Sequence, residues 1–196
     1  MNALDDYMHG EKKEWNEEYY KSVAIHESGH AYLSALSGDI PSLVTIVSRG
    51  SYGGYLAHGS QEDKPNLSKD DILTNIRTAL AGRAVEIEFY GEEKGTNTGI
   101  GSDLRQATNS AMHLICTYAM SPTNTLSLDY NEVLKTTLAE KLVADANELI
   151  SEQYTITQEE VKKGRDRIQA LADFLVKNNQ ATGEDVKRIY GIQDDK

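Results

Sequence analysis

Two histidines four residues apart, His26 and His30, are the residues most suited to chemistry, and Glu27 directly follows the first. Residues at positions i and i+4 of a helix share one face, one turn apart. Both imidazoles could therefore reach one metal ion at the roughly 2.0–2.1 Å of zinc–nitrogen bonds. Glu27 cannot bind in the same way, but its carboxylate could take a proton from a water molecule at an open coordination position. The spacing predicts a zinc site with a general base beside it.

The sequence around this motif favours a helix. Residues 15–37 contain no proline and one glycine, Gly29, and Gly38 follows as a usual helix terminator. On such a helix Tyr19, Val23 and both histidines fall on one stripe, which would face the interior. Unligated imidazoles are costly to bury, whereas ligated ones are not. We therefore favour a metal site over a helix that carries two histidines by chance.

A third ligand has several candidates. His58 is the weakest, because it lies in a short strand that is expected to be exposed, next to Gly59. Glu86 lies on a predicted helix whose small residues suit close packing against the histidine helix. Asp103 begins another helix after a glycine-rich loop, where it could equally be a first-turn residue that favours the helix dipole. The spacing does not decide between Glu86 and Asp103.

Composition indicates an ordinary globular protein. The 196 residues fit one domain, or one compact domain with a helical appendage, at 39% hydrophobic and 26% charged residues. The net charge of -11 argues against nucleic acid as a partner. The single cysteine, Cys116, excludes an intrachain disulfide and is expected in the core. No apolar run approaches the ~18–20 residues of a membrane span, so we expect a soluble, cytoplasmic chain.

The hydrophobic pattern predicts a mainly α fold, with a small β-hairpin beside the HExxH helix and a helical bundle at the C-terminus. The hairpin is expected at 43–47 and 54–58. Ser68 followed by Asp71 predicts a capping box at the start of a helix over 72–90. Further helices are expected at 103–119, 131–154 and 157–177, and a short last helix is capped at Thr182. We divide the chain into a linker-like lead-in, 1–14, a core that holds the metal site, 15–125, and a helical C-terminal part of the same domain, 126–196.

Four segments carry a family resemblance. Residues 20–31 read YKSVAIHESGHA, 44–55 read VTIVSRGSYGGY, 80–86 read LAGRAVE and 98–108 read TGIGSDLRQAT. They resemble, in the same order, the VAxHExGHA, VTIxPRG…GY, LxGRAAE and TGAxNDLxxAT motifs of the peptidase domain of FtsH-type ATP-dependent zinc proteases. Tyr118-Ala119-Met120-Ser121 matches the next landmark, so the resemblance covers nearly the whole chain.

The resemblance implies roles that spacing leaves open. The family's third zinc ligand is the aspartate of the last motif, which corresponds to Asp103, and Glu86 would then orient a ligand histidine. Ser28 replaces the family's usual alanine, and Ile87 stands where a second glutamate is common. The family's transmembrane helices and AAA-type ATPase module have no counterpart in this sequence. Full-length relatives are membrane-anchored, with this domain in the cytoplasm.

We therefore expect a zinc-dependent endopeptidase that cuts unfolded or damaged proteins and, by the resemblance, works as a hexamer. The two histidines and Asp103 would hold Zn²⁺, and Glu27 would act as general base. An extended substrate would add to the edge of the strand that contains Val44, Thr45, Ile46 and Val47. The alternatives are a catalytically idle, zinc-stabilised assembly module and a zinc hydrolase of a non-peptide substrate.

Overall fold

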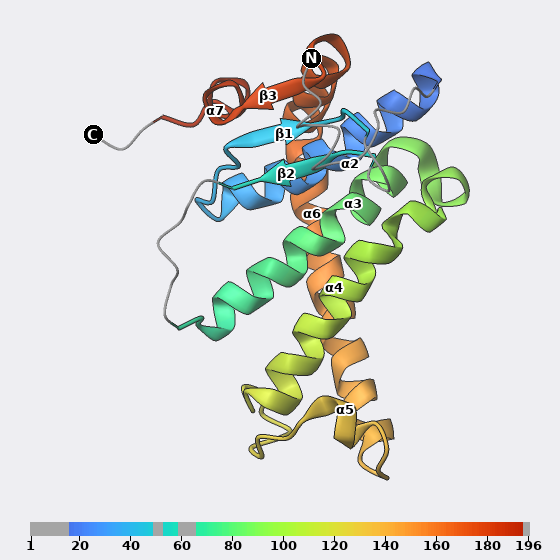
Figure 1. Ribbon diagram of the computed structural model, residues 1–196, viewed down its shortest axis with the longest axis vertical. Coiled ribbons are helices and arrows are strands. Elements are labelled where there is room, and N and C mark those ends of the chain that lie inside the picture. Colours follow the sequence, from blue (N-terminus) through green and yellow to red (C-terminus); the bar gives the residue numbers. More distant parts are fainter. Residues whose placement is uncertain (1–15, 49–52, 59–65, 194–196) are drawn as a thin grey trace, which may run out of the picture.

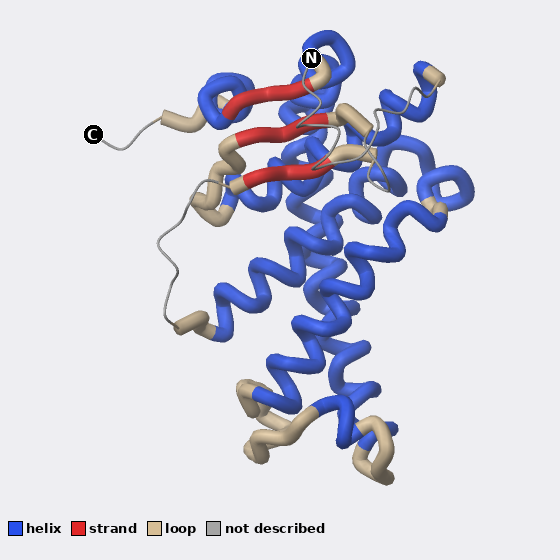
Figure 2. The backbone as a smooth tube through the Cα atoms, viewed as in Figure 1, coloured by secondary structure: helices blue, strands red, loops and turns tan. Residues whose placement is uncertain are grey.

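A computed structural model describes residues 16–48, 53–58 and 66–193 of the chain. Within these ranges, long helices cross one another and a small three-stranded sheet lies at one end of them (Figure 1). Figure 2 shows that helix makes up most of the described backbone. The mainly α fold with a small sheet is confirmed. The expected lead-in, 1–14, lies outside the described residues.

Helix α2, Glu17–Leu36, carries both histidines and Glu27. It begins where the Asn16 side chain accepts a hydrogen bond from the Tyr19 amide at 2.8 Å, which satisfies one of the free amides of the first turn. It ends before Gly38, whose φ of 85° is a conformation that favours glycine. The helix expected at 15–37 is therefore present almost in full.

Helix α3, Lys69–Gly95, packs across α2. Ser68 and Asp71 form a capping box at its start, as the sequence predicts. At Gly91, the expected end, the backbone leaves helical geometry with a φ of 77°, and a further helical turn follows. The sequence therefore identified the position of the break but not the turn beyond it.

Glycines let α2 and α3 approach closely. A Cβ atom on Gly29 would lie 2.6 Å from Cγ1 of Val85, and one on Gly82 would lie 2.3 Å from Cε1 of His26. Both distances are far below van der Waals contact, so neither position accepts a side chain without movement. The small residues of α3 thus form the surface against which the histidine helix packs.

Helix α4, Gly101–Met112, follows a 3₁₀ turn, Thr98–Ile100, and carries Asp103 in its first turn. A π-helical segment, His113–Thr117, continues it toward the predicted end at 119. Cys116 lies in that segment with 0% of its surface exposed, as expected for a small core residue. This part of the chain brings the aspartate next to α3.

The C-terminal bundle differs from expectation. In place of helices at 131–154 and 157–177, the structure has a short α5, Tyr130–Val133, and one continuous α6, Ala139–Asn178. The β-branched residues at the expected break fit a helix because Thr155 and Thr157 donate hydrogen bonds to the carbonyls of Ser151 and Gln153, at 3.1 and 2.9 Å. α6 therefore spans the molecule and packs against α2, α3 and α4.

The sheet has the strand order β2-β1-β3 and is antiparallel throughout. Its strands are β1, Leu43–Thr45, β2, Tyr55–Ala57, and β3, Gln180–Thr182. The hairpin β1–β2 was expected, but β3 was not. Because β1 pairs on both sides, and Ile46 donates its amide to the Asn179 carbonyl, the prediction that substrate adds to the edge of Val44–Val47 is wrong. Helix α7, Gly183–Tyr190, follows β3 from a capping box at Thr182 and Asp185.

Two groups of buried side chains form the core, and α6 contributes to both. One group joins α2 and α3 to the sheet, α6 and α7, and the other joins α3 to α4, α5 and the N-terminal half of α6. Because α6 packs against both α2, which carries the histidines, and α4, which carries Asp103, it holds these two helices in position. Among the described residues, no helix is both long and apolar enough to cross a membrane.

Candidate metal centre

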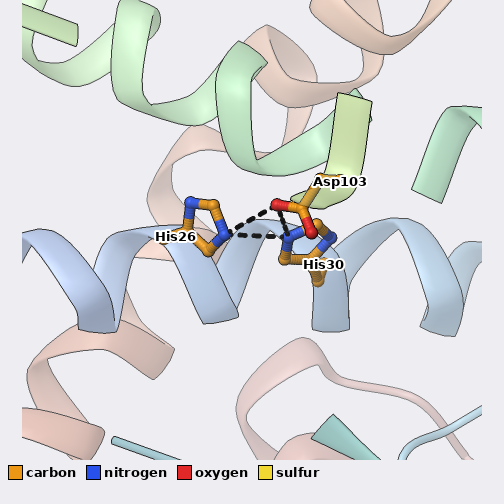
Figure 3. Close-up of side chains that lie close together, drawn as sticks. All are labelled: His26, His30 and Asp103. Carbon is orange, nitrogen blue, oxygen red and sulfur yellow. Dashed lines mark hydrogen bonds and ion pairs between the residues drawn. The ribbon is translucent and has the colours of Figure 1, made fainter. Parts of the chain in front are cut away.

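The side chains of His26, His30 and Asp103 converge from α2 and α4 (Figure 3). The two Nε2 atoms lie 3.1 Å apart, and Oδ2 of Asp103 lies 3.1 Å from Nε2 of His26 and 3.3 Å from Nε2 of His30. Each side chain is only partly exposed, at 16%, 12% and 21% respectively. Three atoms with lone pairs therefore face one small, largely buried volume.

The other ring nitrogen of each histidine is held in place. Nδ1 of His26 donates to Oε1 of Glu86 on α3, and Nδ1 of His30 donates to the carbonyl of Thr78 on the same helix, both at 2.8 Å. A histidine that donates from Nδ1 presents the lone pair of Nε2. These two bonds thus fix the tautomer and orientation in which both rings can bind one metal.

The structure separates the three candidates for the third position. Asp103 lies with the two histidines. Glu86 contacts Nδ1 of His26, the ring nitrogen that does not face the other donors. His58 is not part of this group, and its Nδ1 lies 3.1 Å from Oδ2 of Asp39. Within the described part of the chain, this is the only group of three or more His, Cys, Asp or Glu side chains arranged to hold a metal.

Asn97 is a residue of this site that the sequence analysis missed. Its side-chain amide donates a short hydrogen bond to Oε2 of Glu86, while its Oδ1 accepts from the Gly99 amide at 2.8 Å. It therefore caps the 3₁₀ turn that leads to Asp103 and also holds the carboxylate that orients His26. The available signal was an asparagine two residues before a glycine, which is typical of a side chain that caps a turn.

Glu27 is almost fully buried beside the two histidines, with 7% of its surface exposed. Burial raises the pKa of Glu27, and the nearby histidines oppose that effect. The start of β2 lies directly against it, since a Cβ atom on Gly54 would be 2.9 Å from Oε1 of Glu27. The carboxylate is thus confined between the histidine face of α2 and the backbone that enters β2.

When no metal is bound, the ligand atoms form a tight ionic group. Burial acts to lower the pKa of His26, but hydrogen bonds to Asp103 and Glu86 outweigh it and raise that pKa to about 10. Burial acts to raise the pKa of Asp103, but its bonds to the two histidines hold it well below the usual range. A positive charge is therefore favoured at this position, whether it is a proton or a cation.

A family model described as Peptidase family M41 matches residues 13–189, which is most of the chain. The chain belongs to peptidase family M41. The predicted resemblance to FtsH-type peptidase domains is thereby confirmed.

Several relatives of this M41 chain carry the name ATP-dependent zinc metalloprotease FtsH. The protein from Mycoplasmopsis pulmonis is 28% identical over 95% of this chain and 28% of its own length. The one from Mycoplasma pneumoniae is 32% identical over 87% of this chain and 25% of its own length. A chloroplastic relative from Arabidopsis thaliana is 30% identical over 85% and 26%. The chain thus spans only about a quarter to a third of the length of the relatives it matches.

The donor set of this M41 chain fits zinc. Two ligands bound at 2.0–2.1 Å in tetrahedral geometry lie ~3.3 Å apart, and the three separations here are 3.1 to 3.3 Å. Two imidazoles and one carboxylate are ligands that zinc accepts, and three protein ligands are the number found in catalytic rather than structural sites. Histidines supported by a carboxylate and a carbonyl are also the usual arrangement around zinc.

Proposed function

We propose that this chain is a zinc-dependent endopeptidase domain in which His26, His30 and Asp103 hold Zn²⁺. The observation that carries the proposal is the convergence of these three donors at zinc-like separations, with the buried Glu27 adjacent. Kinship supports it, because the M41 relatives are named zinc metalloproteases. Bound zinc would supply Lewis acidity, which lowers the pKa of water toward ~7 and polarises a carbonyl.

The protein's own side chains then have distinct tasks. Glu27 accepts a proton from the attacking water and later delivers it to the leaving amine, so that one carboxylate serves as base and acid. Its raised pKa suits the first step, because a stronger base accepts a proton more readily. Glu86 keeps the His26 ring in place while charge changes beside it.

The substrate of this domain would be an extended polypeptide. β2 is an outer strand of the sheet, with β1 on its other side, and Gly54, the residue before it, adjoins Glu27. A polypeptide that pairs with the outer edge of β2 would pass the general base with its backbone held by hydrogen bonds. This mode of binding depends on hydrogen bonds to the substrate backbone rather than on one side chain. It favours unfolded proteins as substrates, because their chains can become extended.

The oligomeric state and the partner module are inferred from the relatives alone. The relatives are named ATP-dependent, and the chain matches only 28% and 25% of the length of two of them. We propose that the peptidase works as a homo-hexamer that receives unfolded chains from an AAA-type ATPase module. An idle, purely structural zinc site is disfavoured, because a fourth protein donor does not join the three in the described residues.

Metal analysis coupled to cleavage tests this function. The purified protein should contain one zinc per chain and cut an unstructured, fluorescently labelled polypeptide without ATP. A chelator should abolish cleavage, and added Zn²⁺ should restore it. His30→Ala should lose both zinc and cleavage, while the matched variant His58→Ala should retain both. Full zinc binding by His30→Ala would refute the proposed ligand set.

A further inference from the structure

A large groove lies between the C-terminal end of α2, the N-terminal half of α3 and the middle of α6. Its volume is about 1110 Å³. Three of the apolar side chains that line it, Leu36, Leu67 and Ile156, are 49%, 46% and 40% exposed. Exposed apolar side chains gathered in a concave surface indicate a place where another molecule binds.

One wall of the groove adjoins His30 at Nδ1, the ring nitrogen that does not face the other two donor side chains. Thr78, whose carbonyl accepts the hydrogen bond of His30, is one of its lining residues. Leu33 and Leu36, also in the lining, are three and six residues beyond His30 on α2, which is ~4.5 and ~9 Å along the helix axis. An extended polypeptide covers the same distance in about one to three residues.

Strand β2 connects the general base with the groove. Gly54, just before the strand, contacts Glu27, and His58, just after it, pairs with Asp39, which lines the groove. The outer edge of β2 therefore leads from Glu27 to the groove. A polypeptide paired with this edge would place its next side chains between α2 and α3.

The charges around the groove favour a basic occupant. Four acidic side chains and one cation, Arg77, line it, and Lys163 pairs with one of the acids, Glu160, at 2.7 Å. Arg77 is engaged with its neighbours, since it donates to Gln153 and Thr74 at 2.9 and 2.8 Å. The acidic residues are Asp39, Asp70, Asp71 and Glu160. Asp70 is the most accessible of the four, since its side chain is 87% exposed. Its Oδ1 lies 3.8 Å from Nη2 of Arg77.

We propose that this groove binds the substrate on one side of the scissile bond and selects a bulky apolar residue next to lysine or arginine within about three residues of that bond. The apolar side chain would cover Leu36 and its neighbours, and the basic side chain would face Asp70. This inference rests on the proposed peptidase function. It adds a preference for particular side chains to the pairing with β2, which depends only on the substrate backbone.

Matched peptides test the preference by cleavage and by binding. One set carries Leu-Lys, Leu-Glu or Ser-Ser within three residues of the cut, on either side, and mass spectrometry locates the cut. The zinc-loaded protein should prefer Leu-Lys by kcat/KM on one side only. Binding of the same labelled peptides to Glu27→Gln, followed by fluorescence anisotropy, should show the same order.

Two groove variants and a control define the result. Asp70→Lys should reduce the Leu-Lys to Leu-Glu ratio roughly five- to tenfold, because it reverses a charge close to the peptide. Leu36→Gln should reduce the advantage of both leucine peptides over Ser-Ser. Glu148→Lys makes the same charge change on an exposed part of α6 outside the groove and should leave every ratio as in the parent.

The outcomes separate the groove from the proposed chemistry. Cleavage with ratios that are equal in Asp70→Lys and Glu148→Lys overturns the groove inference and leaves the peptidase intact. Binding that depends on Asp70 without any cleavage supports the groove as a peptide site and refutes the peptidase. Neither binding nor cleavage of any peptide overturns both.

Discussion

At the scale of single residues, Asn97 shows how the site extends beyond its metal-binding atoms. Its amide holds Glu86, which holds His26, and its Oδ1 caps the turn before Asp103. We expect Asn97→Ala to weaken zinc binding about tenfold, because residues that support metal ligands usually contribute that much. Competition with a chromogenic chelator measures the affinity.

A second substitution at this position separates its two contacts. Asn97→Asp keeps the acceptor for Gly99 but replaces the donor with a carboxylate that faces Glu86. If the bond to Glu86 matters, Asn97→Asp should bind zinc at least as weakly as Asn97→Ala. Parent-like affinity in Asn97→Asp would show that only the turn cap contributes.

Ser28 gives a prediction about stability. Its side chain is fully buried, and its hydroxyl has no hydrogen-bond partner among the residues that the structure describes. Ser28→Ala should raise the free energy of unfolding by about 1 kcal/mol, because it removes an unsatisfied polar group and favours helix. Denaturant unfolding measures the change, and zinc content should stay constant. A marked loss of stability would mean that the hydroxyl is satisfied in solution.

The residues of the site differ in how far the sequence could predict them. His26, Glu27 and His30 are predictable because their contacts depend on helical spacing within one element. Asp103 meets them from 73 residues away, so spacing could not choose it over Glu86, and only the family resemblance did. Asn97 could not be predicted, because its role depends on a hydrogen bond to Glu86 on α3, and no local sequence pattern indicates such a contact.

At the scale of elements, the α2–α3 contact controls the position of His26. Gly82→Ala should displace the His26 ring or separate the helices, because the added Cβ would lie 2.3 Å from Cε1. We expect a loss of about 1–3 kcal/mol in stability together with reduced zinc content. Thermal unfolding and metal analysis measure both effects.

Gly101→Ala is the matched control for that substitution. Gly101 begins α4 with a helical φ of -64°, and a Cβ there meets nothing within 4 Å. The control should be neutral or slightly stabilising, since alanine favours helix over glycine. Equal effects of the two substitutions would argue that the close approach to His26 does not matter.

The elements also show what local patterns can miss. The capping boxes at Ser68 and Thr182 are short-range signals, and both helices begin there as predicted. β3 has only three residues, Gln180–Thr182, and its partner strand lies more than 130 positions away, so its pairing could not be read from the sequence. The same strand makes β1 central, which is why substrate was wrongly expected at Val44–Val47.

At the scale of the whole molecule, the charge at the metal centre couples folding to pH. In the metal-free protein the pKa of His26 is raised from 6.5 to about 10. A raised pKa stabilises the fold fully below pH 6.5, and this contribution disappears as the pH rises toward 10. The melting temperature of the metal-free protein should fall across this range, and a flat profile would contradict the assignment.

Zinc should change that dependence, because the metal replaces the proton on His26. The zinc-loaded protein should lose less stability than the metal-free protein between pH 6.5 and 10. Calorimetric titration near pH 8, in buffers of different ionisation enthalpy, should show release of about one proton per zinc bound.

The central claim is that Glu27 activates water at a zinc site in an M41 peptidase. The most direct test compares the parent and Glu27→Gln on the same unstructured, fluorescently labelled polypeptide, after each is shown to carry one zinc per chain. We expect the parent to cut the polypeptide without ATP and Glu27→Gln to be at least 100-fold slower, because a general base is lost. Cleavage by Glu27→Gln at the parent rate, or cleavage by neither protein, would refute this role of Glu27.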